Sequence, residues 1–190
     1  MNSPVTQALS AFIERYEMAA EKIGLSFPRL PLDQDWVSEC QARTCDEEGL
    51  ASWRPVAQVR AVDFSGLENA LELEIHPDVK AYYGSFWSGS LEATSSEGHV
   101  SLIQLWNPAD FDRLIENLIG HALAKKRLKH ALTIFFANTE SESEYFLSVD
   151  NSTGEVLLEK PGVAPVQKVD VCLADFISRL SPSLTSPGIH

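Results

Sequence analysis

The chain has 190 residues, of which 44% are hydrophobic and 22% charged, and this predicts a single globular domain large enough to bury its own core. Its 27 acidic and 15 basic residues give a formal net charge of −12. Such an excess of negative charge disfavours binding to nucleic acid or to bare anionic lipid. A basic peptide or protein surface is the natural complement, although acidity for solubility alone explains the composition equally well.

The cysteines indicate a reducing compartment. Cys40, Cys45 and Cys172 are an odd number and give no disulfide framework. Cys40 and Cys45 have no second pair of ligands nearby, so ordinary thiols are expected rather than a metal site. The N-terminal stretch carries charges and no apolar run approaches ~18 residues, so neither a signal peptide nor a membrane span is expected.

The first predicted element is a helix that begins at Ser3-Pro4, with a capping serine and a first-turn proline, and ends at Gly24. Residues 25–66 are expected to be irregular, with a turn at 46–49 and a short edge strand at 53–55. Residues 67–87 are expected to form one or two short helices that break near His76-Pro77, because proline disfavours helix at the preceding residue.

The second half of the chain alternates strands with helices. Residues 91–94 and 100–105 predict a β-hairpin, and Asn107-Pro108 predicts the start of a long helix that ends in a basic run at Lys125–Lys129. Three strands are expected at 132–137, 145–149 and 156–159, followed by a helix over 171–180. The order predicts an α+β fold in one domain, residues 1–180, with a mostly antiparallel sheet packed against helices and a flexible tail at 181–190.

No catalytic or metal-binding motif is present, and the five histidines are scattered. His121 on the long helix is expected to be a partly buried histidine, hydrogen-bonded within the fold. A small hydrolase that uses Glu116 and His121 is the weakest alternative, because no third group is placed to orient the pair. The basic run could form a nucleic-acid patch, but its favourable position at a helix C-terminus explains it better.

Acidic residues form three clusters that bear on function: Glu72, Glu74 and Asp78; Asp110, Asp112 and Glu116; Glu140, Glu142 and Glu144. Asp110 is accounted for by helix capping, whereas Asp112 and Glu116 share a helix face. In an extended segment the alternation of Glu140, Glu142 and Glu144 would place three carboxylates on one side. Such carboxylates recognise Lys or Arg, but a solvated loop between two strands explains the third cluster as well.

Four stretches of the chain form recognisable motifs: Thr6-Gln7-Ala8-Leu9, Leu105 to Phe111 (Leu-Trp-Asn-Pro-Ala-Asp-Phe), Glu116 to His121 (Glu-Asn-Leu-Ile-Gly-His) and Ser152 to Val156 (Ser-Thr-Gly-Glu-Val). With these motifs the chain resembles the Syd family, the SecY-interacting proteins of bacteria. The resemblance runs from the N-terminus to about residue 180 and is most specific in the long helix.

The resemblance implies a fold similar to the SUKH superfamily and a protein that is peripheral on the cytoplasmic side of the inner membrane. It implies binding to cytosolic loops of SecY, the channel subunit of the translocase, through an acidic groove. The implied role is that of a negative regulator or quality-control factor of protein export, without catalysis and without a cofactor. A SUKH-type immunity protein that neutralises a basic toxin is the alternative.

The positive-inside rule fits this implication, because cytoplasmic loops of membrane proteins are rich in Lys and Arg. An acidic domain without an anchor is then expected to touch the membrane only through its protein partner. The acids expected to line the groove are Glu116, Asp110, Asp112, Glu140, Glu142 and Glu144, with Glu74 and Asp78 further out.

Overall fold

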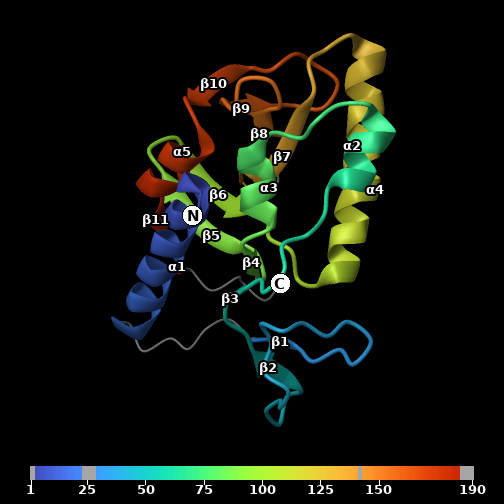
Figure 1. The fold of residues 1–190 in the computed structure, drawn as a ribbon. Helices are drawn as coiled ribbons and strands as arrows, with labels where there is room; N and C mark the ends of the chain where they lie inside the picture. Colours follow the sequence, from blue (N-terminus) through green and yellow to red (C-terminus); the bar gives the residue numbers. More distant parts are fainter. Residues whose placement is uncertain (1–2, 23–28, 141–142, 185–190) are drawn as a thin grey trace.

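The computed structural model describes residues 3–22, 29–140 and 143–184, and in these ranges helices are combined with antiparallel strands (Figure 1). The α+β class is as predicted. Seven strands form one curled antiparallel sheet in the order β10-β9-β8-β7-β6-β5-β11. These strands are β5 (Leu91–Ser95), β6 (Gly98–Leu102), β7 (Thr133–Asn138), β8 (Phe146–Asp150), β9 (Val156–Glu159), β10 (Gln167–Asp170) and β11 (Ser181–Pro182).

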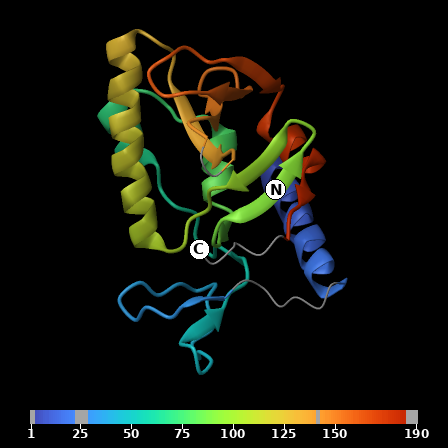
Figure 2. The same cartoon turned by 180° about the vertical axis from the view of Figure 1, so that it is seen from behind.

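Helices cover both faces of this sheet. They are α1 (Pro4–Lys22), α2 (Ser65–Leu71), α3 (Pro77–Tyr83), α4 (Pro108–Leu128) and α5 (Leu173–Arg179). Phe135 and Phe136, neighbours on β7, show the two faces: the Phe135 ring packs 5.8 Å from His121 of α4, and the Phe136 ring packs 5.7 Å from Phe176 of α5. The views from the two sides show α1 and α4 on opposite flanks of the sheet (Figures 1 and 2).

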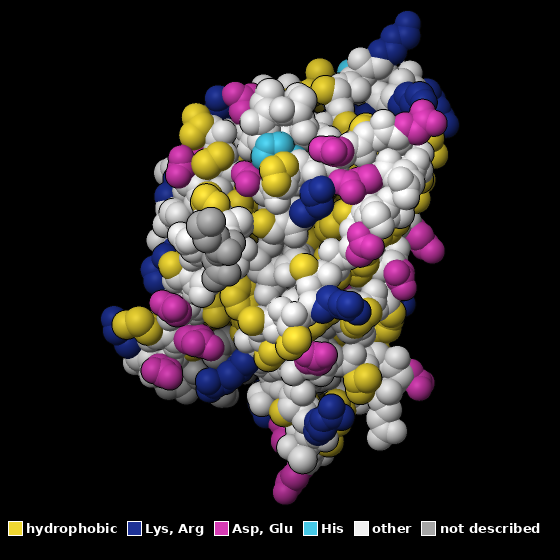
Figure 3. All heavy atoms as spheres, in the orientation of Figure 1, with side chains coloured by type: hydrophobic (Ala, Val, Ile, Leu, Met, Phe, Trp, Pro, Cys, Tyr) yellow, Lys and Arg dark blue, Asp and Glu magenta, His cyan; other side chains and the backbone are white. Residues whose placement is uncertain are grey.

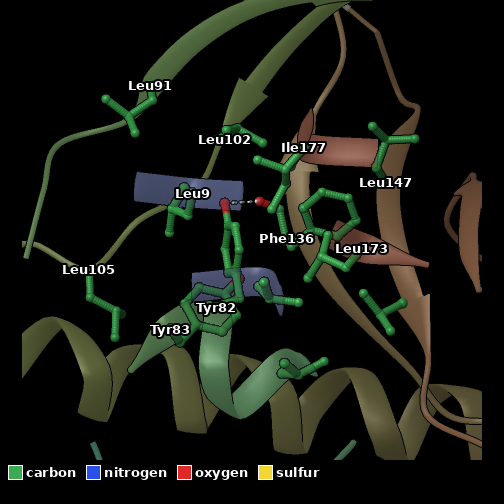
Figure 4. Close-up of a cluster of buried hydrophobic side chains, with 14 of the residues drawn as sticks. Leu9, Tyr82, Tyr83, Leu91, Leu102, Leu105, Phe136, Leu147, Leu173 and Ile177 are labelled. Atoms are coloured by element: carbon green, nitrogen blue, oxygen red, sulfur yellow. Dashed lines mark hydrogen bonds between the residues drawn. The ribbon is translucent and has the colours of Figure 1, made fainter. Parts of the chain in front are cut away.

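The main core lies between the sheet and helices α1, α3 and α5. Figure 4 shows Tyr82 of α3 reaching into it, where its hydroxyl donates to the Phe136 carbonyl at 3.3 Å. The Tyr82 ring stacks edge-on against Tyr83 and Phe136, at 5.0 and 5.7 Å. Burial of aromatic rings of this size dominates the stability of a core, and their hydroxyls need a partner once buried.

The long helices begin where their caps predict. Ser3 Oγ accepts the Thr6 N–H at 3.1 Å at the start of α1, and Asn107 Oδ1 accepts the Asp110 N–H at 2.9 Å at the start of α4. The predicted end of the first helix at Gly24 lies outside the described residues. α4 ends at Leu128, and Lys129, with a left-handed φ of 57°, caps its last turn.

Residues 25–66 contain more regular structure than predicted. β1 (Arg29–Pro31) pairs with β2 (Leu50–Ser52), and β3 (Val56–Ala57) pairs with β4 (Phe86–Trp87). The expected strand at 53–55 is therefore wrong: Trp53 forms an isolated bridge with Gln41, and the paired residues lie on either side. Strands of two or three residues are too short to show an alternating pattern. The turn at 46–49 is confirmed, with Gly49 at φ 78°.

The C-terminal part adds two strands that the sequence did not predict, β10 and β11. β11 pairs with β5, opposite Thr94 and Ala93, so the sheet extends two residues beyond the expected domain end at 180. Residues 185–190 of the expected tail lie outside the described residues. In the described parts of the chain, no helix combines the length and the hydropathy that crossing a membrane requires.

Candidate partner-binding surface

The junction between α2 and α3 presents the first acidic cluster. Asn151 fixes this junction: its side-chain oxygen accepts the His76 N–H and its amide donates to the Glu74 carbonyl, both at 2.9 Å. His76 in turn caps α3 by accepting the Asp78 N–H on its ring nitrogen at 3.2 Å. These bonds use the backbone, so the Glu74 carboxylate is left exposed and that of Asp78 half-buried.

α4 presents the second cluster next to the first. Asp112 and Glu116 are exposed one turn apart. α2 packs against α4, and the Phe64 and Phe111 rings meet edge-on at 5.0 Å at the base of this contact. Figure 3 shows Asp and Glu side chains spread over α2 and along α4 on the face presented there. The structure therefore brings the first two clusters to neighbouring elements.

Asp110 has a different role from Asp112 and Glu116. Its carboxylate accepts the Trp106 N–H at 2.9 Å, while its own N–H is capped by Asn107. This reciprocal capping holds the first turn of α4 and leaves Asp110 half-buried. The capping interpretation of Asp110 is confirmed.

The third cluster belongs to the loop between β7 and β8. Glu140 accepts the His99 N–H at 3.2 Å. The backbone pairing of β6 with β7 ends at Ser101 and Asn138, so the Glu140 side chain supplies a hydrogen bond where the strands no longer pair. Glu144 forms an ion pair with Lys160 at 2.5 Å. Glu142 lies outside the described residues. Two of the three carboxylates thus have partners inside the fold.

The acidic residues differ in whether a cation already neutralises them. Glu68 pairs with Lys80 at 2.7 Å and Glu155 with Lys168 at 2.5 Å. The hydrogen bond from Lys80 and one from the Ile75 N–H lower the pKa of Glu68. By contrast, no Lys, Arg or His of residues 3–22, 29–140 or 143–184 lies within 4.0 Å of four predicted acids, namely Glu74, Asp78, Asp112 and Glu116. We call these four the helical acidic surface.

The outer face of β5 and β6 carries charged residues that the sequence argument did not select. Glu92 lies opposite Ser101 and accepts its hydroxyl at 2.8 Å, and it also contacts His99 Nε2 at 2.8 Å. The alternation of buried Leu91 and Ala93 with Glu92 is the signal that places this carboxylate on the face away from the core.

His121 is confirmed as a half-buried, hydrogen-bonded histidine. Its Nε2 lies 3.1 Å from Thr133 Oγ1, and burial, followed by the nearby Lys125 charge, lowers its pKa. Glu116 precedes His121 by five residues, which places the two side chains roughly 140° apart around the helix axis. The geometry therefore does not bring them together as a hydrolytic pair.

The interpretation of Lys125–Lys129 as a surface run at the helix end is wrong for Lys125. This residue is buried. It forms an ion pair with Glu159 of β9, which is fully buried and also accepts the Ser148 hydroxyl at 2.5 Å. Burial alone would raise the pKa of Glu159, but the hydrogen bonds from Lys125, Ser148 and Thr133 lower it overall. The surface part of the run is Lys126, Arg127 and Lys129.

Metal coordination receives no geometric support from the side chains that the structure places. Cys40 is buried and Cys45 exposed. Across residues 3–22, 29–140 and 143–184, no three His, Cys, Asp or Glu side chains are arranged to share an ion.

The model of the Syd protein (SUKH-2) family matches residues 6–182. The chain belongs to the Syd family.

Protein Syd of Pseudoalteromonas atlantica is 38% identical over 187 residues, which cover 97% of this chain and 100% of the relative. Protein Syd of Colwellia psychrerythraea is 40% identical over 190 residues, covering 95% and 94%. Protein Syd of Alteromonas mediterranea is 39% identical over 178 residues, covering 94% and 96%. The predicted Syd membership is thereby confirmed over nearly the whole chain.

Proposed function

We propose that this Syd-family chain binds the basic cytosolic loops of SecY through the helical acidic surface. The observation that carries the proposal is that four carboxylates, those of Glu74, Asp78, Asp112 and Glu116, have no cation from the described residues within 4.0 Å. Asp112 and Glu116 lie on α4, which packs against α2, and Glu74 and Asp78 lie in the segment that follows α2. Carboxylates in that state offer charge-assisted hydrogen bonds to incoming Lys or Arg side chains.

The charge of the whole chain supports the same partner. A net charge of −12 steers the protein toward the Lys- and Arg-rich loops that membrane proteins expose to the cytoplasm. In this proposal the protein is cytoplasmic, becomes peripheral on the inner membrane when SecY is present, and restrains protein export as a negative regulator or quality-control factor. Glu140, Glu142 and Glu144 stay in the proposal as further candidate contacts for the partner. Glu144 would first have to exchange Lys160 for a cation of the partner.

The proposal is tested by binding of the purified protein to membranes with and without SecY at about 50 and about 500 mM salt, over which the Debye length falls from roughly 14 to 4 Å. Binding to SecY-containing membranes should exceed binding to SecY-free membranes and fall at high salt. Equal binding to both membranes would overturn the proposal. Capture of a basic toxin in place of a translocase subunit would instead favour the SUKH-type immunity role.

A further inference from the structure

We infer that the C-terminal end of α4 is a contact site for anionic lipid headgroups. The site, which we call the basic tip, consists of Lys126, Arg127, Leu128 and Lys129. It goes beyond the proposed function, because it concerns the lipid surface itself and needs no protein partner.

The charge of the basic tip is the opposite of the charge of the rest of the protein. Lys126, Arg127 and Lys129 are exposed, and no carboxylate in the described part of the chain lies within 4.0 Å of them. Two acids packed near this end are already neutralised, Glu159 by the buried Lys125 and Glu144 by Lys160. Figure 3 shows the Lys and Arg side chains gathered at the upper end of α4, above its acidic length. A local surplus of about three positive charges remains on a chain of net charge −12.

Exposed apolar side chains lie among these bases. Leu128, between Arg127 and Lys129, is 44% exposed, and Val163 is 47% exposed on the loop after β9. Leu128 and Val163 line the same cavity of about 130 Å³, together with Pro161 and Gly162. Leu123, 54% exposed, precedes Lys126 and Arg127 by one turn on the same side of the helix.

This combination fits a lipid surface better than a nucleic acid. Bases interleaved with aliphatic side chains bind at the headgroup–acyl boundary, where the bases meet phosphate and the aliphatic groups leave water. A phosphate backbone in RNA would use the bases but would leave Leu128 and Val163 in water. Dipole stabilisation at a helix end accounts for the bases, but not for exposed leucine and valine beside them.

The geometry of α4 also allows the tip to reach lipid while the acidic surface stays away from it. Glu116 precedes Lys126 by ten residues and Asp112 precedes it by fourteen, which correspond to roughly 15 and 21 Å along the helix. Both distances exceed the Debye length of about 10 Å at 0.1 M salt, so repulsion of these acids from the membrane is screened when the tip touches it. The sequence led us to expect contact with the membrane only through a protein partner. The basic tip would add a weak, direct contact with the lipid.

The test is sedimentation of the full chain with vesicles that contain roughly 30% phosphatidylglycerol in phosphatidylcholine, against vesicles of phosphatidylcholine alone, at about 0.1 M salt. We expect the protein to bind the anionic vesicles and not the neutral ones. Each surface base contributes roughly fivefold to such binding, so the variant Lys126→Gln/Arg127→Gln/Lys129→Gln should bind about 100-fold more weakly. Leu128→Gln should weaken binding on the order of fivefold without a change of charge.

A matched variant, Lys22→Gln/Arg43→Gln/Arg60→Gln, lowers the net charge by the same three units at exposed positions away from the tip. It should retain binding to the anionic vesicles. Equal losses in both triple variants, or no binding of the unaltered protein to anionic vesicles, would overturn the inference. Binding of an RNA hairpin that depends on the three tip bases, with no vesicle binding, would assign the tip to nucleic acid instead. Binding to SecY is measured separately, so failure of either proposal is recognised independently of the other.

Discussion

Lys125 of α4 and Glu159 of β9 form an ion pair inside the protein, between the helix and the face of the sheet that it covers. Each charge of a buried ion pair loses its hydration, so its hydrogen-bonding atoms all need partners within the protein. Glu159 meets this need with Lys125 on one carboxylate oxygen and the Ser148 hydroxyl on the other. The pair therefore fixes where α4 lies along β9, and α4 carries half of the helical acidic surface.

Removal of one partner of this pair should be costly. In Lys125→Met the Glu159 carboxylate stays buried without its cation, and the free energy of unfolding should fall by about 3–5 kcal/mol. Urea denaturation monitored by tryptophan fluorescence measures the change. The double variant Lys125→Met/Glu159→Met should recover most of the loss, because neither charge is then left unpaired. Lys126→Met is the surface control and should change stability by less than about 0.5 kcal/mol. Equal losses in the two single lysine variants would contradict the account.

The Glu97–Arg179 pair predicts a defined acid dependence of stability. The hydrogen bond from Arg179 at 2.7 Å, more than any other contact, lowers the pKa of Glu97 to about 2. Because the folded-state pKa lies below the unfolded value of about 4.3, the pair stabilises the fold above that value and loses its contribution as the pH falls toward 2. Glu97 is 45% exposed, so solvent screening keeps the effect small. The stability difference between the wild-type protein and Arg179→Met should shrink as the pH falls from about 5 to 2. A difference that grows in acid would be incompatible with this assignment.

The sequence predicts a helix or strand correctly where its local pattern is strong. α4 was predicted because Asn107 and Pro108 cap its start and an apolar stripe follows, and the hairpin of β5 and β6 because apolar and polar residues alternate. β1 to β4 were missed because strands of two or three residues are held by pairing with distant segments, which no local pattern reveals.

The candidate site was predicted only in part, for a related reason. The sequence identifies carboxylates but not their partners: Glu97 pairs with Arg179, 82 residues away, and Glu159 with Lys125, 34 residues away. The burial of Lys125, however, is indicated by the sequence itself. Lys125 follows Leu118 and Ala122 at helical spacing, so it falls on the buried stripe of α4, in contrast to Lys126 and Arg127.

Gly120 offers a prediction in the opposite direction, toward greater stability. It lies within α4 without a left-handed φ, and a Cβ added there would meet no atom within 4 Å, so neither space nor backbone conformation requires glycine. Gly120→Ala should raise the free energy of unfolding by about 0.5–1 kcal/mol, because alanine favours the helix. Thermal unfolding measures the gain. Gly154→Ala is the contrasting variant and should destabilise, because Gly154 has a φ of 78° and its Cβ would come within 2.8 Å of the His76 ring. A destabilised Gly120→Ala would show that an unseen constraint acts on this turn.

The central claim is that the unpaired acids of α4 hold a basic loop of SecY, and it is tested most directly by neutralising them. Affinity for SecY-containing membranes would be measured for Asp112→Asn/Glu116→Gln and for the control Glu97→Gln/Glu155→Gln, which removes two acids already paired with Arg179 and Lys168. The account predicts that the α4 variant binds at least tenfold more weakly, since two charge-assisted hydrogen bonds at about 1.5 kcal/mol each are lost, while the control changes little. Equal affinities of the α4 variant and the unaltered protein would contradict the claim.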